Sequence, residues 1–268
     1  MRSLLLLPTF AVVALSIGCR NDPSGAPSPT AASNPPALAK KTKDPTPATL
    51  AKKTKAPNPP VPKKKTKQEL AIEAIMKQGG TVRIDPEDLE QKPVVFVDLH
   101  GFRNAVVSLD SLASLTKLRE VNLHNAGFSD ADLERLRGLP DLTKVNLSGT
   151  KITDAGLAVL QSLPNLRALN LNETAITNAG LQYLRGMANL SDLSIYGTKV
   201  TDEGLAQLMV INALQKLLIG GGNTITDRGL TTLATMRQLR DLTVLSKRVT
   251  KSGIEDLKIA LPQIKITH

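Results

Sequence analysis

The chain has 268 residues, of which 2% are aromatic and none is tryptophan, with one cysteine and a formal net charge of +10. A single cysteine excludes an internal disulfide and a cysteine-ligated zinc site. Residues 1–67 hold twelve Lys and Arg against two Asp, so the rest of the chain carries no net charge and the basic pI does not describe it.

The first 18 residues have the pattern of an export signal. Arg2 provides a charged start, and Leu4 to Ile17 is an apolar stretch that suits a signal peptide and is short for a membrane span. The stretch ends in LSIGC at positions 15–19, which resembles the bacterial lipoprotein signal, where cleavage precedes a cysteine that is then acylated. Ser16 departs from the preferred leucine, which stands one place earlier. The resemblance implies lipidation of Cys19 and a membrane-anchored protein of the cell envelope; the alternative is an ordinary cleaved signal with an incidental cysteine.

Residues 19–66 are rich in Pro, Ala, Thr and Lys and nearly free of large apolar side chains, and LAKKTK occurs twice, at 38–43 and 50–55. Such a segment buries too little apolar surface to offset its ordering entropy, so we expect a disordered basic tether. Its lysines suit contact with an anionic polymer or lipid surface, and a self-repelling soluble spacer is the alternative. No aromatic residue interleaves the lysines, which argues against a nucleic-acid site.

Residues 67–93 are expected to cap the following domain. Lys67 to Gln78 has the pattern of a helix that ends at Gly79-Gly80. Thr81 to Ile84 is expected to add one strand beside it.

A 24-residue repeat fills the rest of the chain, with four copies beginning at Leu118, Leu142, Leu166 and Leu190. Within a copy, Val145-x-Leu147 alternates at strand spacing, and Leu157 and Leu160 lie at helical spacing. Between them, Thr153-Asp154 has the chemistry of a helix N-cap. A unit this short cannot bury its own apolar face, so the copies must stack.

The pattern L-x-x-L-x-L-x-x-T-x-I-T-D-x-G-L resembles the leucine-rich repeat family, with Thr150, Thr174 and Thr198 in place of the usual Asn or Cys. The predicted fold is an α/β leucine-rich repeat solenoid, with parallel strands on the concave face and short helices on the convex face. Further copies from Val94, Leu214 and Leu239 bring the domain to about seven repeats plus a C-terminal cap over residues 94–268. Gly220-Gly221-Gly222 lengthens one copy by a residue; we interpret it as a bulged junction and not a phosphate loop, because no lysine follows.

By family resemblance, the concave face is the expected partner-binding surface, and the strand phase places polar side chains in columns across it. One column runs from Asp98 through Asn122, Asn146 and Asn170, with flanking columns on either side; a ladder of stacked amides that only solvates the sheet is the alternative for the Asn row. The predicted partner-binding residues are Phe96, Asp98, His100, Asn122, His124, Asn146, Asn170, Asn172 and Tyr196.

The sequence contains none of the common catalytic or nucleotide-binding motifs, so we predict a non-enzymatic protein without a cofactor or a metal site. His100 and His124 lie one period apart and have Asp98 nearby, but no third ligand is evident, and we interpret them as exposed polar residues.

Two functions fit the sequence best. The first is a lipid-anchored envelope protein whose repeats bind a protein or polysaccharide. The alternative is a structural envelope protein, in which the tether adheres to anionic polymer and the repeats form a passive scaffold. Adaptors for ubiquitin ligation share the T-D-x-G-L turn, but no F-box-like domain accompanies it here.

Overall fold

The computed structural model describes residues 64–102, 111–222 and 224–268, and Lys64–His268 forms one compact unit. The predicted signal peptide, Cys19 and nearly all of the tether lie outside the described residues. None of the described helices is long and apolar enough to span a membrane.

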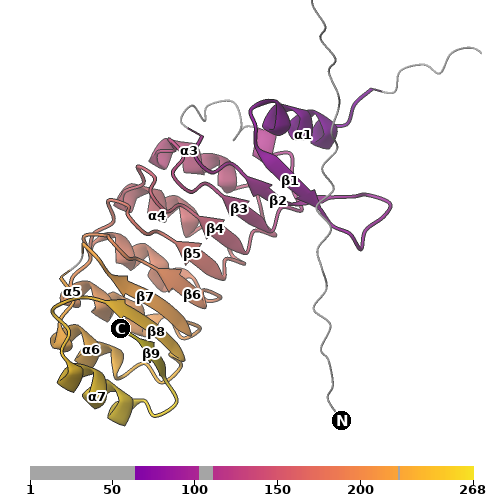
Figure 1. The fold of residues 1–268 in the computed structure, drawn as a ribbon. Coiled ribbons are helices and arrows are strands. Elements are labelled where there is room, and N and C mark those ends of the chain that lie inside the picture. The colour runs from indigo at the N-terminus through magenta and orange to yellow at the C-terminus, as the bar shows by residue number, and fades with distance from the viewer. Residues whose placement is uncertain (1–63, 103–110, 223) are drawn as a thin grey trace, which may run out of the picture. The chain divides into compact units, whose positions relative to one another are not determined.

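A single sheet runs through the unit, and its strands follow one another in chain order (Figure 1). From β2 onward each strand is parallel to the next, with equivalent repeat positions in register, such as Val97 opposite Val121 and Val121 opposite Val145. The strands in the described residues are β1 (Thr81–Ile84), β2 (Val94–Asp98), β3 (Glu120–Asn122), β4 (Lys144–Asn146), β5 (Ala168–Asn170), β6 (Asp192–Ser194), β7 (Lys216–Gly220), β8 (Asp241–Leu245) and β9 (Lys265–Thr267). This arrangement confirms the predicted solenoid.

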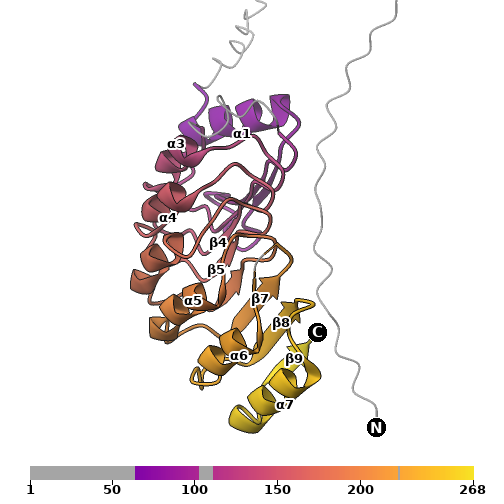
Figure 2. The ribbon, with the colours of Figure 1, turned by 90° about the vertical axis from the view of Figure 1, so that its left-hand side faces the viewer.

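Short helices line the opposite side of the stack (Figure 2). Several begin at a threonine N-cap whose hydroxyl accepts from a first-turn N–H, as Thr153 does from Ala155 at 3.3 Å. Some repeats form α-helix and others the tighter 3₁₀ helix (labelled η). The described helices are α1 (Lys67–Lys77), α3 (Asp130–Leu133), η1 (Glu134–Leu136), α4 (Asp154–Leu160), η2 (Gly180–Gly186), α5 (Asp202–Leu205), η3 (Ala206–Val210), α6 (Asp227–Leu233) and α7 (Lys251–Ala260).

Between strands and helices lies one continuous apolar core. Each repeat contributes its inward strand residues and its helix leucines, and in the second copy Val145, Leu147, Leu157 and Leu160 are all buried. Because each repeat covers the apolar face of its neighbour, the core runs from one end of the unit to the other.

Buried threonines occupy the position where the leucine-rich repeat pattern usually has Asn or Cys. Thr150, Thr174 and Thr198 are almost fully buried, and each donates its hydroxyl to the carbonyl three residues earlier, at 2.6–2.8 Å. The hydroxyl therefore hydrogen-bonds the neighbouring backbone: each threonine satisfies a carbonyl at the end of its own strand.

A second set of hydrogen bonds joins successive repeats and explains the T-D-x-G-L turn. The carboxylate of Asp154 accepts from both the backbone N–H (2.8 Å) and the hydroxyl (2.6 Å) of Thr177 in the next repeat. We call this pair of hydrogen bonds the buckle. The same buckle links Asp130 to Thr153, Asp202 to Thr226 and Asp227 to Thr250. The turn glycine leaves room for this carboxylate, because a Cβ on Gly180 would overlap the Asp154 side chain.

Both ends of the unit depart from the repeat. Helix α1 begins with a capping box between Thr66 and Glu69 and ends one residue before the expected Gln78. Strand β1 follows it and pairs antiparallel with β2. At the C-terminal end, Lys251 occupies the position that holds the buckle carboxylate in earlier repeats, and β9 is the last strand of the sheet.

The glycine insertion lies at a close contact between backbones. Strand β7 continues to Gly220, where a Cβ would overlap the carbonyl of Leu245 in β8. Gly221 has a φ of 69°, and a Cβ there would lie 2.9 Å from the ring of Tyr196. Gly220 and Gly221 thus give room to a repeat that is one residue longer, as a bulged junction requires.

Candidate functional site

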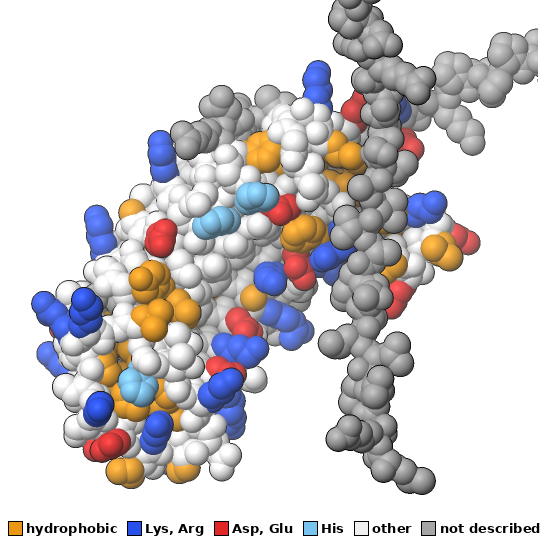
Figure 3. All heavy atoms as spheres, viewed as in Figure 1, with side chains coloured by type: hydrophobic (Ala, Val, Ile, Leu, Met, Phe, Trp, Pro, Cys, Tyr) orange, Lys and Arg blue, Asp and Glu red, His pale blue; other side chains and the backbone are white. Residues whose placement is uncertain are grey.

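The outward side chains of strands β2 to β8 and of the turns that follow them form one face of the sheet, in three parallel columns. We call these the charged column, the amide column and the turn column. The amide column contains Asp98, Asn122, Asn146, Asn170, Ser194, Leu218 and Thr243. The turn column contains His100, His124, Ser148, Asn172 and Tyr196. Figure 3 shows acidic and basic side chains alternating along one edge of this face. The charged column contains Phe96, Glu120, Lys144, Ala168, Asp192, Lys216 and Asp241, in register, with Lys265 of β9 beyond it.

Ion pairs along the charged column join neighbouring strands. Lys144 Nζ lies 3.9 Å from Glu120, and Lys216 Nζ lies 3.5 Å from Asp192. Both lysine side chains are about 60% exposed, so these pairs are solvated and contribute little to stability. Their charge remains available to a partner at this surface.

The amide column is partly a structural ladder. Asn122 donates its amide to Asp98 at 3.0 Å, and Asn146 donates to Asn122 at 2.9 Å. Each side-chain oxygen also accepts from a backbone N–H two residues later, as Asn170 does from Asn172 at 3.0 Å. The oxygens of the Asn row therefore stabilise the strand ends, which favours the ladder interpretation for that part of each amide.

The two histidines of the turn column follow Asp98 and Asn122 on neighbouring strands, and Figure 3 shows two histidine side chains next to each other on this face. His100 Nδ1 lies 2.9 Å from Asp98. His124 Nδ1 lies 3.2 Å from the carbonyl of Ser148, and its Nε2 lies 3.0 Å from the Asn125 amide. Within the described residues, no group of three His, Cys, Asp or Glu is placed to hold a metal ion.

The remaining predicted residues are partly occupied by other contacts. The Arg83 guanidinium of β1 lies over the Phe96 ring at 4.6 Å. Asn172 accepts from the Ser194 hydroxyl at 2.6 Å and from the backbone N–H of Tyr196 at 2.8 Å. Phe96 and Tyr196 are half-buried, so each presents only part of its ring to a partner.

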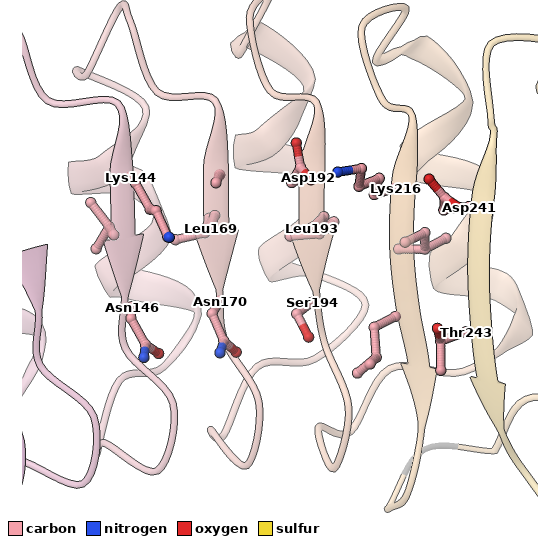
Figure 4. Close-up of a pocket in the computed structure, with 14 residues that line it drawn as sticks. Lys144, Asn146, Leu169, Asn170, Asp192, Leu193, Ser194, Lys216, Asp241 and Thr243 are labelled. Atoms are coloured by element: carbon pink, nitrogen blue, oxygen red, sulfur yellow. Dashed lines mark ion pairs between the residues drawn. The ribbon is translucent and has the colours of Figure 1, made fainter. Parts of the chain in front are cut away.

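A hollow of about 380 Å³ opens in the middle of the strand face, over strands β4 to β8. Ala168 lies between Lys144 and Asp192 in the charged column, and its small side chain leaves the space that a longer one would fill. Asn170, Ser194 and Leu218 of the amide column also line it, and Figure 4 shows Lys216 extending toward Asp192 on its wall.

Of the nine predicted partner-binding residues, only Asn146 and Asn170 line this hollow. The others lie around it or toward the N-terminal end of the face. Lys144, Asp192 and Lys216 belong to a flanking column that the strand phase places on this face, although they are not among the nine predicted partner-binding residues. Ala168 was not predicted. The feature of the sequence that could have located the hollow is Ala168, the one small residue in the charged column.

Part of the chain matches the sequence model of a known family. The model described as "Leucine Rich repeat" matches residues 138–160 and 162–184, which include the centre of the face. No curated protein matches the chain.

Solved structures with similar folds include bacterial repeat proteins. Internalin C2 of Listeria monocytogenes is 22% identical, with a TM-score of 0.44, over 65% of this chain and 81% of that one. An internalin (inlF) of the same organism is 23% identical, with a TM-score of 0.40, over 59% of each chain. A leucine-rich repeat protein of Leptospira interrogans is 23% identical, with a TM-score of 0.43, over 59% of this chain and 39% of that one.

Proposed function

We propose that this leucine-rich repeat protein is a non-enzymatic, lipid-anchored protein of the bacterial cell envelope that binds a protein partner through its strand face. Leucine-rich repeat domains in general are scaffolds for protein binding, and solenoids present extended concave surfaces for it. Polysaccharide is the second ligand class that a polar face of this kind admits.

The observation that carries the proposal is the hollow over β4 to β8. It combines exposed charges, from Lys144, Asp192 and Lys216, with an apolar element from Leu218 and an open centre at Ala168. Protein interfaces require this combination, because apolar contacts supply affinity while charged groups set orientation and specificity. None of these side chains is needed for the core, whose residues point to the opposite side of the strands.

The anchoring part of the proposal rests on the sequence. The apolar stretch of residues 4–17 ends at Cys19, the only cysteine of the chain, and a lysine-rich segment follows it. A lipid at Cys19 would hold the chain to a membrane, and the basic segment would add attraction to an anionic surface.

Filling the hollow tests the binding function. The full chain carrying Ala168→Arg is compared with wild type in cross-linked capture from envelope extract, followed by mass spectrometry. We expect the specific partner to be lost because the arginine occupies the open centre of the face. Ala206→Arg is the matched control, since Ala206 is exposed in η3 on the helical side.

Capture of the same proteins by both arginine variants would contradict binding through the strand face. If a chain without residues 20–63, which keeps Cys19 and Thr66, loses every captured partner while Ala168→Arg loses none, the tether is the binding element. That result would support the structural envelope protein instead.

Replacing Cys19 tests the anchor. We expect Cys19→Ala to move the protein from the membrane fraction to the soluble fraction and to abolish labelling by a radioactive fatty acid. Unchanged membrane association of Cys19→Ala, together with no labelling of wild type, would contradict lipidation.

A further inference from the structure

In the charged column, residues at equal distances on either side of Ala168 carry opposite charges. From Glu120 to Lys216, the residues on successive strands are acidic, basic, neutral, acidic and basic. Read in the opposite direction, the order is basic, acidic, neutral, basic and acidic. A copy of the column turned end for end therefore meets the original with opposite charges at every charged position.

The reversal holds for these five strands. Beyond them, uncharged Phe96 of β2 falls opposite Asp241 of β8. Arg83 of β1 is in register with Phe96 and falls opposite Lys265 of β9, so these two like charges are a cost that the central pairs must outweigh.

A two-fold axis parallel to the strands and passing over Ala168 brings two such columns together. The rotation turns the strand face of the second copy toward that of the first and reverses its strand order. Each column of one copy then lies opposite the same column of the other copy. It places Glu120 opposite Lys216 of the second copy and Lys144 opposite Asp192 of the second copy. The Glu120–Lys144 pair of each copy then lies opposite the Asp192–Lys216 pair of the other copy. Each such group contains four side chains whose charges alternate.

The hollow makes room at the axis. Ala168 faces its own copy there, so no side chain of the charged column blocks the approach, and the two hollows form one space between the copies. Lys144 and Lys216 are long and about 60% exposed, so they can extend across a concave gap. The exposed Arg167, which precedes β5, is a like-charged neighbour near the axis that these groups of four must outweigh.

The amide column tolerates the same arrangement. Asn146 falls opposite Ser194, whose hydroxyl oxygen can accept from the Asn146 amide. Asn170 falls opposite itself with its side-chain oxygen already accepting from the backbone N–H of Asn172, so we assign no hydrogen bond across the axis to this position. No like charges meet within this column, because Asp98 falls opposite Thr243.

From this self-complementary order the geometry points to a second copy of the chain as a partner of the strand face, in a symmetric dimer whose axis passes over Ala168. The inference rests on the proposed function, because it names the occupant of the same face. It also predicts that dimerisation and capture of another partner compete for the hollow.

Paired charge reversals test the arrangement. Sedimentation equilibrium of the full chain should show a monomer–dimer equilibrium that weakens with added salt. Lys144→Glu and Asp192→Lys, each alone, oppose like charges at two symmetric positions and should weaken the dimer by roughly tenfold or more. An equimolar mixture of these two variants restores opposite charges at both positions and should form a heterodimer of near wild-type affinity.

Lys151→Glu is the control for Lys144→Glu, because Lys151 is exposed outside the columns and its replacement changes the net charge by the same amount. A monomer at every concentration would overturn the inference. Failure of the mixture to associate would also overturn the inference. The mixture restores opposite charges only if position 144 of one copy faces position 192 of the other. Either failure leaves the proposed function intact if Ala168→Arg still loses a captured partner.

Discussion

At the scale of single residues, the buckle between repeats explains the residue types at three positions of the turn. Asp154 must be acidic to accept two hydrogen bonds, and Thr177 must supply both a backbone N–H and a hydroxyl. Gly180 must lack a side chain because the carboxylate occupies the adjacent space. Each member of the motif is therefore determined by its neighbour in the adjacent repeat.

Gly180→Ala should destabilise the fold by about 1–3 kcal/mol, as overpacking of a buried site does. The added methyl group would overlap the Asp154 carboxylate and displace it from Thr177. Gly138→Ala is the control, because a Cβ there meets no atom within 4 Å. Urea denaturation measures both changes, and equal midpoints for the two variants would contradict the role assigned to the turn glycine.

The third buckle has an amide in place of a carboxylate, with an effect on a neighbouring group. The side-chain amide of Asn178 donates to the Thr201 hydroxyl at 2.8 Å, so that hydroxyl directs its own proton to Glu203. The Thr201 hydrogen bond holds the pKa of the Glu203 carboxyl below its ordinary value. A lowered carboxyl pKa stabilises the fold above the unfolded-state pKa, and this contribution is lost as the pH falls through the folded-state pKa.

Asn178→Asp should raise the pKa of Glu203 toward its ordinary value. A carboxylate at position 178 accepts the Thr201 proton, as Asp154 accepts that of Thr177, and adds a negative charge nearby. NMR titration of the Glu203 side-chain carboxyl carbon measures the shift, with the exposed Glu255 as an internal reference. An unchanged titration of Glu203 would show that Thr201 does not control it.

At the scale of elements, the repeat predicted the strands and their register because apolar side chains at period two can face only one side of a sheet. Val145 and Leu147 are buried as expected, and Asn146 between them faces outward. The sequence did not distinguish the helix types: Gly180–Gly186 forms a 3₁₀ helix where α4 forms an α-helix. Both types satisfy the same leucine spacing, so the pattern cannot separate them.

The centre of the candidate site was harder to predict for a different reason. Asn122 and Asn146 were predicted as binding residues because they are polar residues repeated at one strand position, yet their side-chain oxygens accept hydrogen bonds at the strand ends. The hollow arises from what Ala168 lacks, and its walls come from lysine and aspartate side chains that a surface strand commonly carries. A space between side chains becomes visible only when the columns are placed side by side.

The N-terminal cap is the element most dependent on local signals. Helix α1 buries only Ala71 and Ile75, so its capping box is a large share of its stability. Thr66→Ala should destabilise it by about 0.5–2 kcal/mol and increase amide exchange in α1. Hydrogen exchange by mass spectrometry measures this locally; an equal increase at β5 would show that the cap and the repeats unfold together.

At the scale of the whole molecule, each repeat completes the core of the one before it. Removing residues 239–268 takes away β8, α7 and β9, and it uncovers apolar residues of the preceding repeat, among them Ile219, Leu230 and Leu233. We expect a loss of roughly 2 kcal/mol for each large side chain that becomes exposed. The truncated chain should melt at a lower temperature and bind a hydrophobic dye.

Removal of His268 alone is the control for the truncation, since this residue is exposed and follows β9. A truncated chain that melts with the wild type would mean that repeats hold their structure independently. That outcome would contradict the shared core.

The buckle has a consequence for how such a chain can change in length. A repeat duplicated between Asp130 and Thr250 brings its own acceptor, which is a carboxylate in every copy except the one with Asn178, and its own threonine. Both new junctions can therefore be made as the old ones were. A repeat added after α7 would meet Lys251, whose ammonium group cannot accept from a threonine. A repeat added at this end would therefore lack the hydrogen bonds that join the interior repeats.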